Sequence, residues 1–193
     1  MNKTMRVFII LCLVGSLITG CQQSPRKQYY LLSATPTANH GIAITRTLGL
    51  GPIDVADYLR NSQITINRNA NHLLTTDNAY WGEPLQKGIM RVLTVNLMNH
   101  QPDTIIEAFP WRSDSAPKFS LRLSIYDLQI INGEALINAS WKLINNETKA
   151  VLTQQHFVRN KPSGDSPAQI AGIYSKLLVE LAGEMNKAIA LQN

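Results

Sequence analysis

Two stretches in the second half of the chain alternate strictly between apolar and polar residues. They cover residues 119–125 and 137–143, and Asn132-Gly133 lies between them. A period of two predicts strands with one buried face, and an Asn-Gly pair signals a tight hairpin turn. Asn145-Asn146 marks a second turn before a third apolar stretch at 151–158. The pattern predicts a meander of three antiparallel strands.

Two other segments repeat apolar residues at spacings of three and four. They cover residues 85–97 and 170–185, and this spacing predicts helices with one apolar face. Pro84 suits the first turn of the first helix. Ser166 suits the cap of the second helix, with Pro167 just inside it.

The first half of the chain contains shorter apolar stretches separated by turn residues. Strands are predicted at 28–33 and 43–50, and a hairpin joins strands at 63–68 and 72–76. A helical turn near residues 54–59 is predicted to be capped by Asp54. Together the elements predict a single α+β domain. Its sheet is mixed and mainly antiparallel, with two longer amphipathic helices packed on one face.

The N-terminus carries an apolar stretch that is too short to span a membrane. Residues 7–18 are mostly apolar, and the basic residues Lys3 and Arg6 precede them. This length fits the apolar part of a secretory signal, about 7–15 residues, rather than the roughly 20 residues of a membrane span. Residues 1–20 are therefore predicted to be a signal peptide.

Cys21 follows Leu17-Ile18-Thr19-Gly20, an order typical of a bacterial lipobox. We expect Cys21 to carry a thioether-linked diacylglycerol and an N-acyl chain, residues 21–27 to form a lipidated tether, and residues 28–193 to form the domain. Gln22, where Asp would favour the inner membrane, indicates the periplasmic leaflet of the outer membrane. Two alternatives remain open: a cleaved signal with an incidental cysteine, and an uncleaved anchor.

Composition narrows the function classes. The formal net charge is +5, of which Lys3 and Arg6 supply two units, and the longest basic cluster is Arg26-Lys27. Nucleic acid is therefore not an expected partner. The histidines have no metal-ligand spacing, and no nucleophile motif occurs, so neither catalysis, a metal nor a cofactor other than the lipid is expected. The histidines are His40, His72, His100 and His156.

Several large side chains fall in predicted loops or at the ends of elements. Aromatic side chains of this kind either complete a core or anchor a protein–protein contact, and the pattern does not separate the two roles. The set comprises Tyr58, Leu59, Tyr80, Trp81, Phe109 and Trp111.

These residues also carry a family likeness. The stretch Leu50-Gly51-Pro52-Ile53, followed by Asp57-Tyr58-Leu59-Arg60, resembles the opening motif of the ABC-type transport auxiliary lipoproteins. Trp81-Gly82-Glu83-Pro84-Leu85 is similar to that family's second motif, and Phe109-Pro110-Trp111 falls where a later block would lie. Ala56 departs from the proline that many relatives carry.

The resemblance implies a non-enzymatic subunit of a lipid-transport machine. Its expected partners are an MCE-domain protein that spans the periplasm (PqiB-like) and, indirectly, an inner-membrane subunit (PqiA-like). The membrane is reached through the lipid anchor, and a homo-oligomeric ring is a further expectation. The residues expected to contact the partner are Pro52, Tyr58, Leu59, Trp81 and Trp111.

Two other functions stay open at this stage. The first is a periplasmic lipid-binding carrier, in which the helices and the sheet enclose an apolar cavity. The second is a periplasmic enzyme or enzyme activator, which the sequence favours least.

Overall fold

The computed structural model describes residues 25–36, 41–69, 71–112 and 114–191. The described strands form one open eight-stranded sheet, and two long helices accompany it. The predicted α+β class is confirmed, with a mixed, mostly antiparallel sheet. The elements are β1 Gln28–Tyr30, β2 Arg46–Val55, the 3-10 turn η1 Asp57–Arg60, β3 Gln63–Asn69, β4 His72–Trp81, α2 Leu85–His100, β5 Thr104–Ala108, β6 Phe119–Ile131, β7 Glu134–Asn145, β8 Val151–Pro162 and α3 Pro167–Ala190.

The predicted meander forms one side of the sheet, with β8 at the edge and β6 next to β2. β6 pairs antiparallel with β7, and β7 pairs antiparallel with β8. Each of the three strands is longer than the stretch predicted for it from the sequence. Asn132 and Gly133 have φ values of 50° and 76°, the left-handed conformation that a two-residue hairpin turn requires at both central positions. Most apolar residues of β6 and β7 face the helices, so this hairpin forms one wall of the core.

β2 extends the sheet beyond β6 through parallel pairing. It pairs with β6 on one side and with the short strand β5 on the other. The expected end of this strand at Gly51-Pro52 is wrong, because β2 continues through them to Val55. The expected role of Asp54 as a cap is also wrong. Asp54 lies within β2, and η1 is preceded by Ala56 without a side-chain cap.

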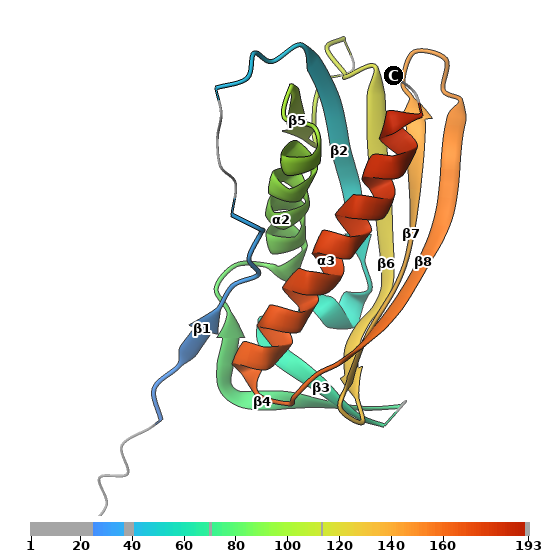
Figure 1. Ribbon diagram of the computed structural model, residues 1–193. Coiled ribbons are helices and arrows are strands. Elements are labelled where there is room, and N and C mark those ends of the chain that lie inside the picture. Colours follow the sequence, from blue (N-terminus) through green and yellow to red (C-terminus); the bar gives the residue numbers. More distant parts are fainter. Residues whose placement is uncertain (1–24, 37–40, 70, 113, 192–193) are drawn as a thin grey trace, which may run out of the picture.

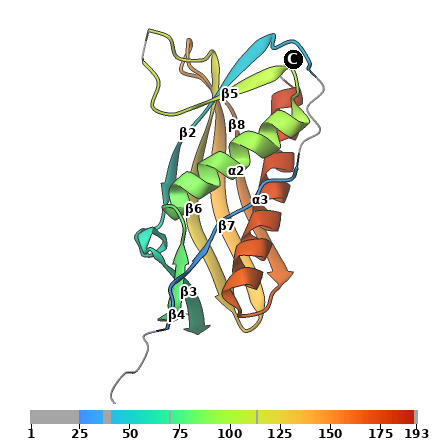
Figure 2. The same ribbon diagram turned by 90° about the vertical axis from the view of Figure 1, so that its left-hand side faces the viewer.

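Both helices lie on the same face of the sheet (Figures 1 and 2). α2 packs over β2 and β5, α3 packs over β7 and β8, and the two helices contact each other. Ser166 forms the predicted cap as part of a capping box with Gln169, and Pro167 opens α3. Among the described residues, no helix lies on the opposite face of the sheet.

The lower end of the molecule in Figure 1 holds a smaller strand group, β1, β4 and β3. The predicted β3–β4 hairpin is confirmed, with β4 continuing to Trp81. The upper end holds the start of β2, the end of α3 and the connection between β5 and β6. The two ends therefore carry different segments of the chain.

Candidate functional site

The first described residues are fastened firmly to the domain, whereas Cys21 lies outside the described residues. β1 pairs in parallel with β4, and the segment that follows crosses both helices. Side chains of the helices hold this segment by its backbone, so the point where the tether joins the domain is fixed. The bonds are Arg91 Nη2 to Leu32 O at 2.9 Å, Ser33 N to Ser175 Oγ at 2.9 Å and Thr35 N to Asn96 Oδ1 at 3.0 Å.

The Trp81–Leu85 motif supports the same junction. The Gly82 amide donates to Tyr30 O at 2.8 Å. Glu83 forms an ion pair with Arg91 at 2.5 Å and thereby orients the guanidinium that reaches Leu32. This motif therefore joins the N-terminal strand to the first turns of α2.

A second cluster lies inside the core, beneath η1. Leu59 and Trp81 are only 4% and 8% exposed, and the Trp81 ring stacks on Tyr174 with 6.2 Å between the ring centroids. The Tyr58 hydroxyl accepts a hydrogen bond from Leu128 N, and the Tyr174 hydroxyl donates to Leu128 O, each at 3.1 Å.

These two tyrosines compensate for a gap in the sheet. β6 pairs with β2 only as far as Ile125 and meets β3 only at Ile131, so the backbone between them lacks a strand on that side. Buried amide and carbonyl groups must be paired, and the phenols provide partners at Leu128. Burial raises the pKa of both phenols above its ordinary value, and the hydrogen bond from Leu128 partly opposes this for Tyr58.

A third cluster lies on the face of the sheet without helices, where two glycines of β2 make room for the segment after β5. A Cβ on Gly49 would lie 2.8 Å from Cη2 of Trp111, and one on Gly51 would lie 2.7 Å from Cβ of Phe109. The Phe109 and Trp111 rings meet edge to face at 5.2 Å. Phe109 remains 45% exposed, and Trp111 is half-buried.

The five residues expected to contact a partner thus fall into two groups. Leu59 and Trp81 lie in the core with the half-buried Tyr58, which favours the packing alternative for them. Pro52 is half-buried and follows Gly51, so it lies near Phe109 on the uncovered face with Trp111. The association of Gly49 and Gly51 with residues 109–111 was missed from the sequence, although small residues in a strand signal a close approach.

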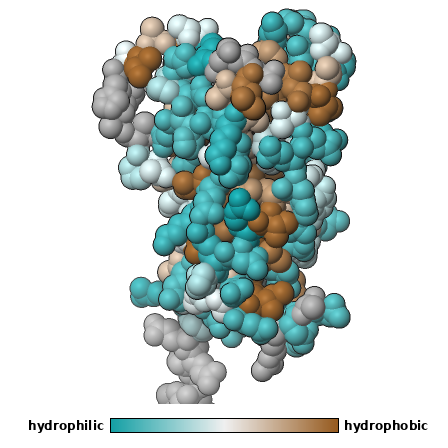
Figure 3. Space-filling model, turned by 45° about the vertical axis from the view of Figure 1, so that its right-hand side comes forward, coloured by the Kyte–Doolittle hydropathy of each residue, from teal (hydrophilic) through white to brown (hydrophobic). Residues whose placement is uncertain are grey.

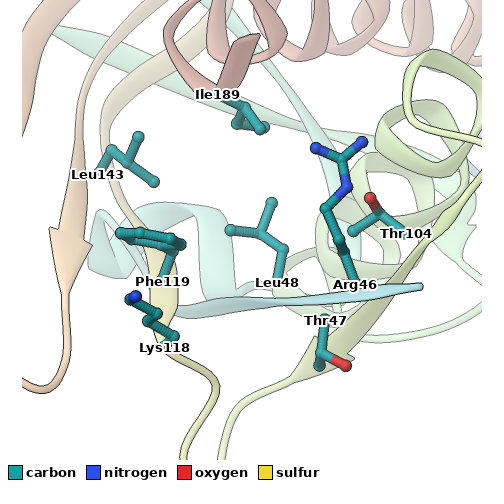
Figure 4. A pocket seen from close by; sticks show the side chains of 8 residues that line it. All are labelled: Arg46, Thr47, Leu48, Thr104, Lys118, Phe119, Leu143 and Ile189. Atoms are coloured by element: carbon teal, nitrogen blue, oxygen red, sulfur yellow. The ribbon is translucent and has the colours of Figure 1, made fainter. Parts of the chain in front are cut away.

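An apolar cavity of about 230 Å³ lies on the helix side of the sheet. Figure 4 shows Leu48, Phe119, Leu143 and Ile189 around it. The Arg46 side chain borders it and is held by Asp103, with Nη2 and Oδ1 2.7 Å apart. The hydrogen bonds from Arg46 lower the pKa of the Asp103 carboxyl. Ligand sites for drug-sized molecules usually measure about 300–1,000 Å³, so this cavity is small for a whole phospholipid.

The remaining described surface offers fewer candidate features. Figure 3 shows the side that includes α3 and β8, where hydrophilic side chains predominate and hydrophobic ones form separate patches. In the described ranges, no three His, Cys, Asp or Glu side chains gather to hold a metal ion. None of the helices that the structure describes is long and apolar enough to cross a membrane.

Solved structures share this fold at low sequence identity. A protein described as uncharacterized has a TM-score of 0.70 and 17% identity, covering 86% of this chain and 99% of its own. Protein XCC0632 from Xanthomonas campestris has a TM-score of 0.67 and 15% identity, covering 86% and 97%. The hypothetical protein CT253 from Chlamydia trachomatis has a TM-score of 0.51 and 7% identity, covering 76% and 99%. These likenesses establish the fold alone.

No curated protein matches the chain by sequence. The family model of the ABC-type transport auxiliary lipoprotein component, by contrast, matches residues 29–186, which include nearly all of the described domain. Membership of this family indicates a membrane-anchored lipoprotein with an auxiliary role in transport. The chain belongs to the ABC-type transport auxiliary lipoprotein component family.

Proposed function

We propose that the chain is the outer-membrane docking subunit of a trans-envelope MCE-type lipid transport system, similar to PqiC of the paraquat-inducible Pqi system. A diacylglycerol and an N-acyl chain on Cys21 hold it in the periplasmic leaflet. The MCE-domain protein that spans the periplasm binds its uncovered sheet face. The family and the lipobox order of residues 17–21 support the anchor.

The tether limits where the domain works. Residues 21–27 span at most about 25 Å when fully extended, at roughly 3.3–3.6 Å per residue. The domain is therefore confined to a thin layer at the membrane surface. Confinement raises its effective concentration for a partner that reaches the same layer.

The aromatic pair on the uncovered face, formed by exposed Phe109 and half-buried Trp111, is the observation that carries the docking role. Phe109 and Trp111 are held in place against Gly49 and Gly51, so their rings are ordered before any partner arrives. Aromatic anchors dominate binding energy at interfaces, and preorganised side chains lose little entropy on binding. The described part of the N-terminal segment that follows β1 lies against the helices and not on this face.

Co-purification from cells tests the docking role. Phe109→Ala removes an exposed ring, and Tyr29→Ala is the matched control because Tyr29 is 65% exposed on β1. We expect Phe109→Ala to reduce recovery of the MCE-domain protein at least tenfold without a change in melting temperature, and Tyr29→Ala to leave recovery unchanged. Equal recovery with both variants would refute docking at this face.

The apolar cavity beside Phe119 and Ile189 favours the carrier alternative. Its volume of about 230 Å³ supports a docking role over the transport of whole phospholipids. Native mass spectrometry of the protein released from detergent distinguishes the two. A non-covalent phospholipid that remains bound in this cavity, and is lost with Leu143→Trp, would favour the carrier.

A further inference from the structure

A second feature of the uncovered face is a groove of about 470 Å³ where β2, β6 and β7 meet. Three cationic side chains line it: Arg122 of β6, Lys142 of β7 and Lys149 of the turn before β8. Asp54 is the acidic residue among the side chains that line it. The formal charge of the groove is therefore positive.

The three cations have no close anionic partner in the part of the chain that the structure describes. Within the residues that the structure describes, Arg122, Lys142 and Lys149 form neither an ion pair nor a side-chain hydrogen bond. Arg122 and Lys142 lie directly opposite each other in the β6–β7 ladder. Like charges at opposed positions destabilise a sheet. The fold therefore tolerates a repulsion that a bound anion would relieve.

The backbone of Lys149, which also lines the groove, adopts a strained conformation. Its φ is 61°, in the left-handed region that Gly or Asn occupies more readily. A residue held in this region costs on the order of 1 kcal/mol or more and often marks a functional site. Here the turn places a third cationic group on the wall of the groove.

The rest of the lining suits an amphiphile. Pro52, Ile144 and Val151 supply apolar contacts, and Ser124 and Ser140 supply hydroxyl groups. The Ser124 hydroxyl has no hydrogen-bond partner among the described residues. Opposite β6, the register of β2 shifts between Leu50 and Ile53, an irregularity beside Arg122.

We propose that this groove binds the phosphate group of a phospholipid, with the glycerol and the first acyl carbons against the apolar residues. Arg122, Lys142 and Lys149 would bind the phosphate oxygens through charge-assisted hydrogen bonds, which are stronger than neutral ones. An acidic peptide would meet the same cations, but the compact groove and its apolar rim favour a headgroup over an extended chain. The proposal goes beyond docking and does not depend on the MCE partner.

Calorimetric titration of the full-length protein in nonionic detergent tests the site. The probes are dihexanoyl phosphatidylglycerol, dihexanoylglycerol without phosphate, inorganic phosphate and a hexaglutamate peptide. The double variant Arg122→Gln/Lys142→Gln removes two charges from the groove. Lys87→Gln/Lys176→Gln removes two charges from exposed helix positions and is the matched control.

We expect phosphatidylglycerol to bind wild type and control equally, and the groove variant to bind it at least tenfold more weakly. Dihexanoylglycerol is expected not to bind. The groove variant should melt at the same temperature as wild type or higher, because the opposed charges are gone. If it melts lower, Lys149→Gln alone, outside the ladder, is expected to weaken binding at least threefold.

Three results would overturn the proposal. Unchanged lipid binding by the groove variants would place any binding elsewhere. Inorganic phosphate binding as tightly as the lipid would leave a simple anion site. Binding of hexaglutamate without lipid binding would assign the groove to an acidic protein segment. Each result is independent of the Phe109→Ala co-purification, so the two proposals fail separately.

Discussion

At the residue scale, the family motifs act mostly through packing and backbone hydrogen bonds. Gly49 and Gly51 accept the aromatic rings of residues 109–111, and Tyr58 completes the pairing of Leu128. These side chains thus determine where the uncovered face is apolar and where the sheet is complete.

The packing of Trp111 against Gly49 can be tested directly by substitution of the glycine. Gly49→Ala puts a Cβ 2.8 Å from the indole and 3.0 Å from Ser120 Cβ, so we expect overpacking to cost about 1–3 kcal/mol in denaturant unfolding. Gly172→Ala is the control, because nothing lies within 4 Å of its new Cβ in α3. It is expected to gain about 0.5–1 kcal/mol. Equal effects of the two variants would contradict the packing described.

The two phenols on Leu128 make a second test. Tyr58→Phe and Tyr174→Phe each leave a backbone group at Leu128 without its partner, and each is expected to cost about 1–3 kcal/mol. Because they act on one residue, the double variant should depart from additivity by at least about 0.5 kcal/mol. Tyr126→Phe, on an exposed side chain, should change stability by less than about 0.5 kcal/mol. Strict additivity would argue against a shared role.

Alkaline pH probes the same phenols. Burial raises the pKa of Tyr58 and Tyr174, so the folded state favours the neutral phenol. Their contribution to stability is complete below the ordinary phenol pKa of 10.0 and is lost as pH rises through the folded-state pKa. We expect the free energy of unfolding to fall less steeply above pH 10 in Tyr174→Phe than in wild type. Parallel curves would show that burial does not hold this phenol neutral.

At the element scale, the register of β6 and β7 depends on two factors, the geometry of the hairpin turn and the burial of apolar side chains in the core. A two-residue turn at Asn132-Gly133, continued without interruption, would set Leu123 opposite Lys142. The irregularity between Ile125 and Asp127 shifts the register by one residue and sets Leu123 opposite Trp141, so both apolar side chains face the core. The same shift sets Arg122 opposite Lys142 and so creates the cationic groove.

This competition explains what the sequence could and could not predict. The meander, both helices and the Ser166 cap depend on local periodicity and capping, and they were predicted. β5 was missed because Thr104–Ala108 is short and Ile105 and Glu107 point to solvent. The meeting of Gly49 with Trp111 joins segments about sixty residues apart, and no local pattern encodes such a contact. For the same reason, the sequence left open whether Leu59 and Trp81 pack in the core or contact a partner.

The contacts that hold β1 and the following segment against the helices predict a local effect on stability. Arg91→Gln removes the ion pair to Glu83 and the bond to Leu32 O. We expect amide hydrogen exchange of residues 28–35 to accelerate while exchange in β6 and β7 is unchanged, because local opening needs only these contacts to be lost. The control Arg112→Gln breaks an exposed pair with Asp114 and should leave residues 28–35 unaffected. Uniform acceleration throughout would show that Arg91 supports the whole domain instead.

At the scale of the whole molecule, the two faces of the sheet carry different features. The helix face receives the N-terminal segment, and the opposite face carries the aromatic pair and the cationic groove. On our proposal, the anchor supplies location, and the uncovered face supplies recognition.

The anchor can be tested with a matched pair of cysteines. Cells fed an alkyne-labelled fatty acid should label wild type and Cys12→Ala equally, since Cys12 lies in the proposed leader. Cys21→Ala should carry no label, because the acyl chains need that thiol. Label on Cys21→Ala, or its loss from Cys12→Ala, would contradict acylation at Cys21.

The most direct test of the docking role is photocrosslinking in living cells. A benzoylphenylalanine at position 109 probes the uncovered face, and one at position 29 probes the tether side. The account predicts that position 109 forms an adduct containing the MCE-domain protein and that position 29 does not. An adduct with that protein at position 29 alone, or at neither position while it is present, would contradict docking at the uncovered face.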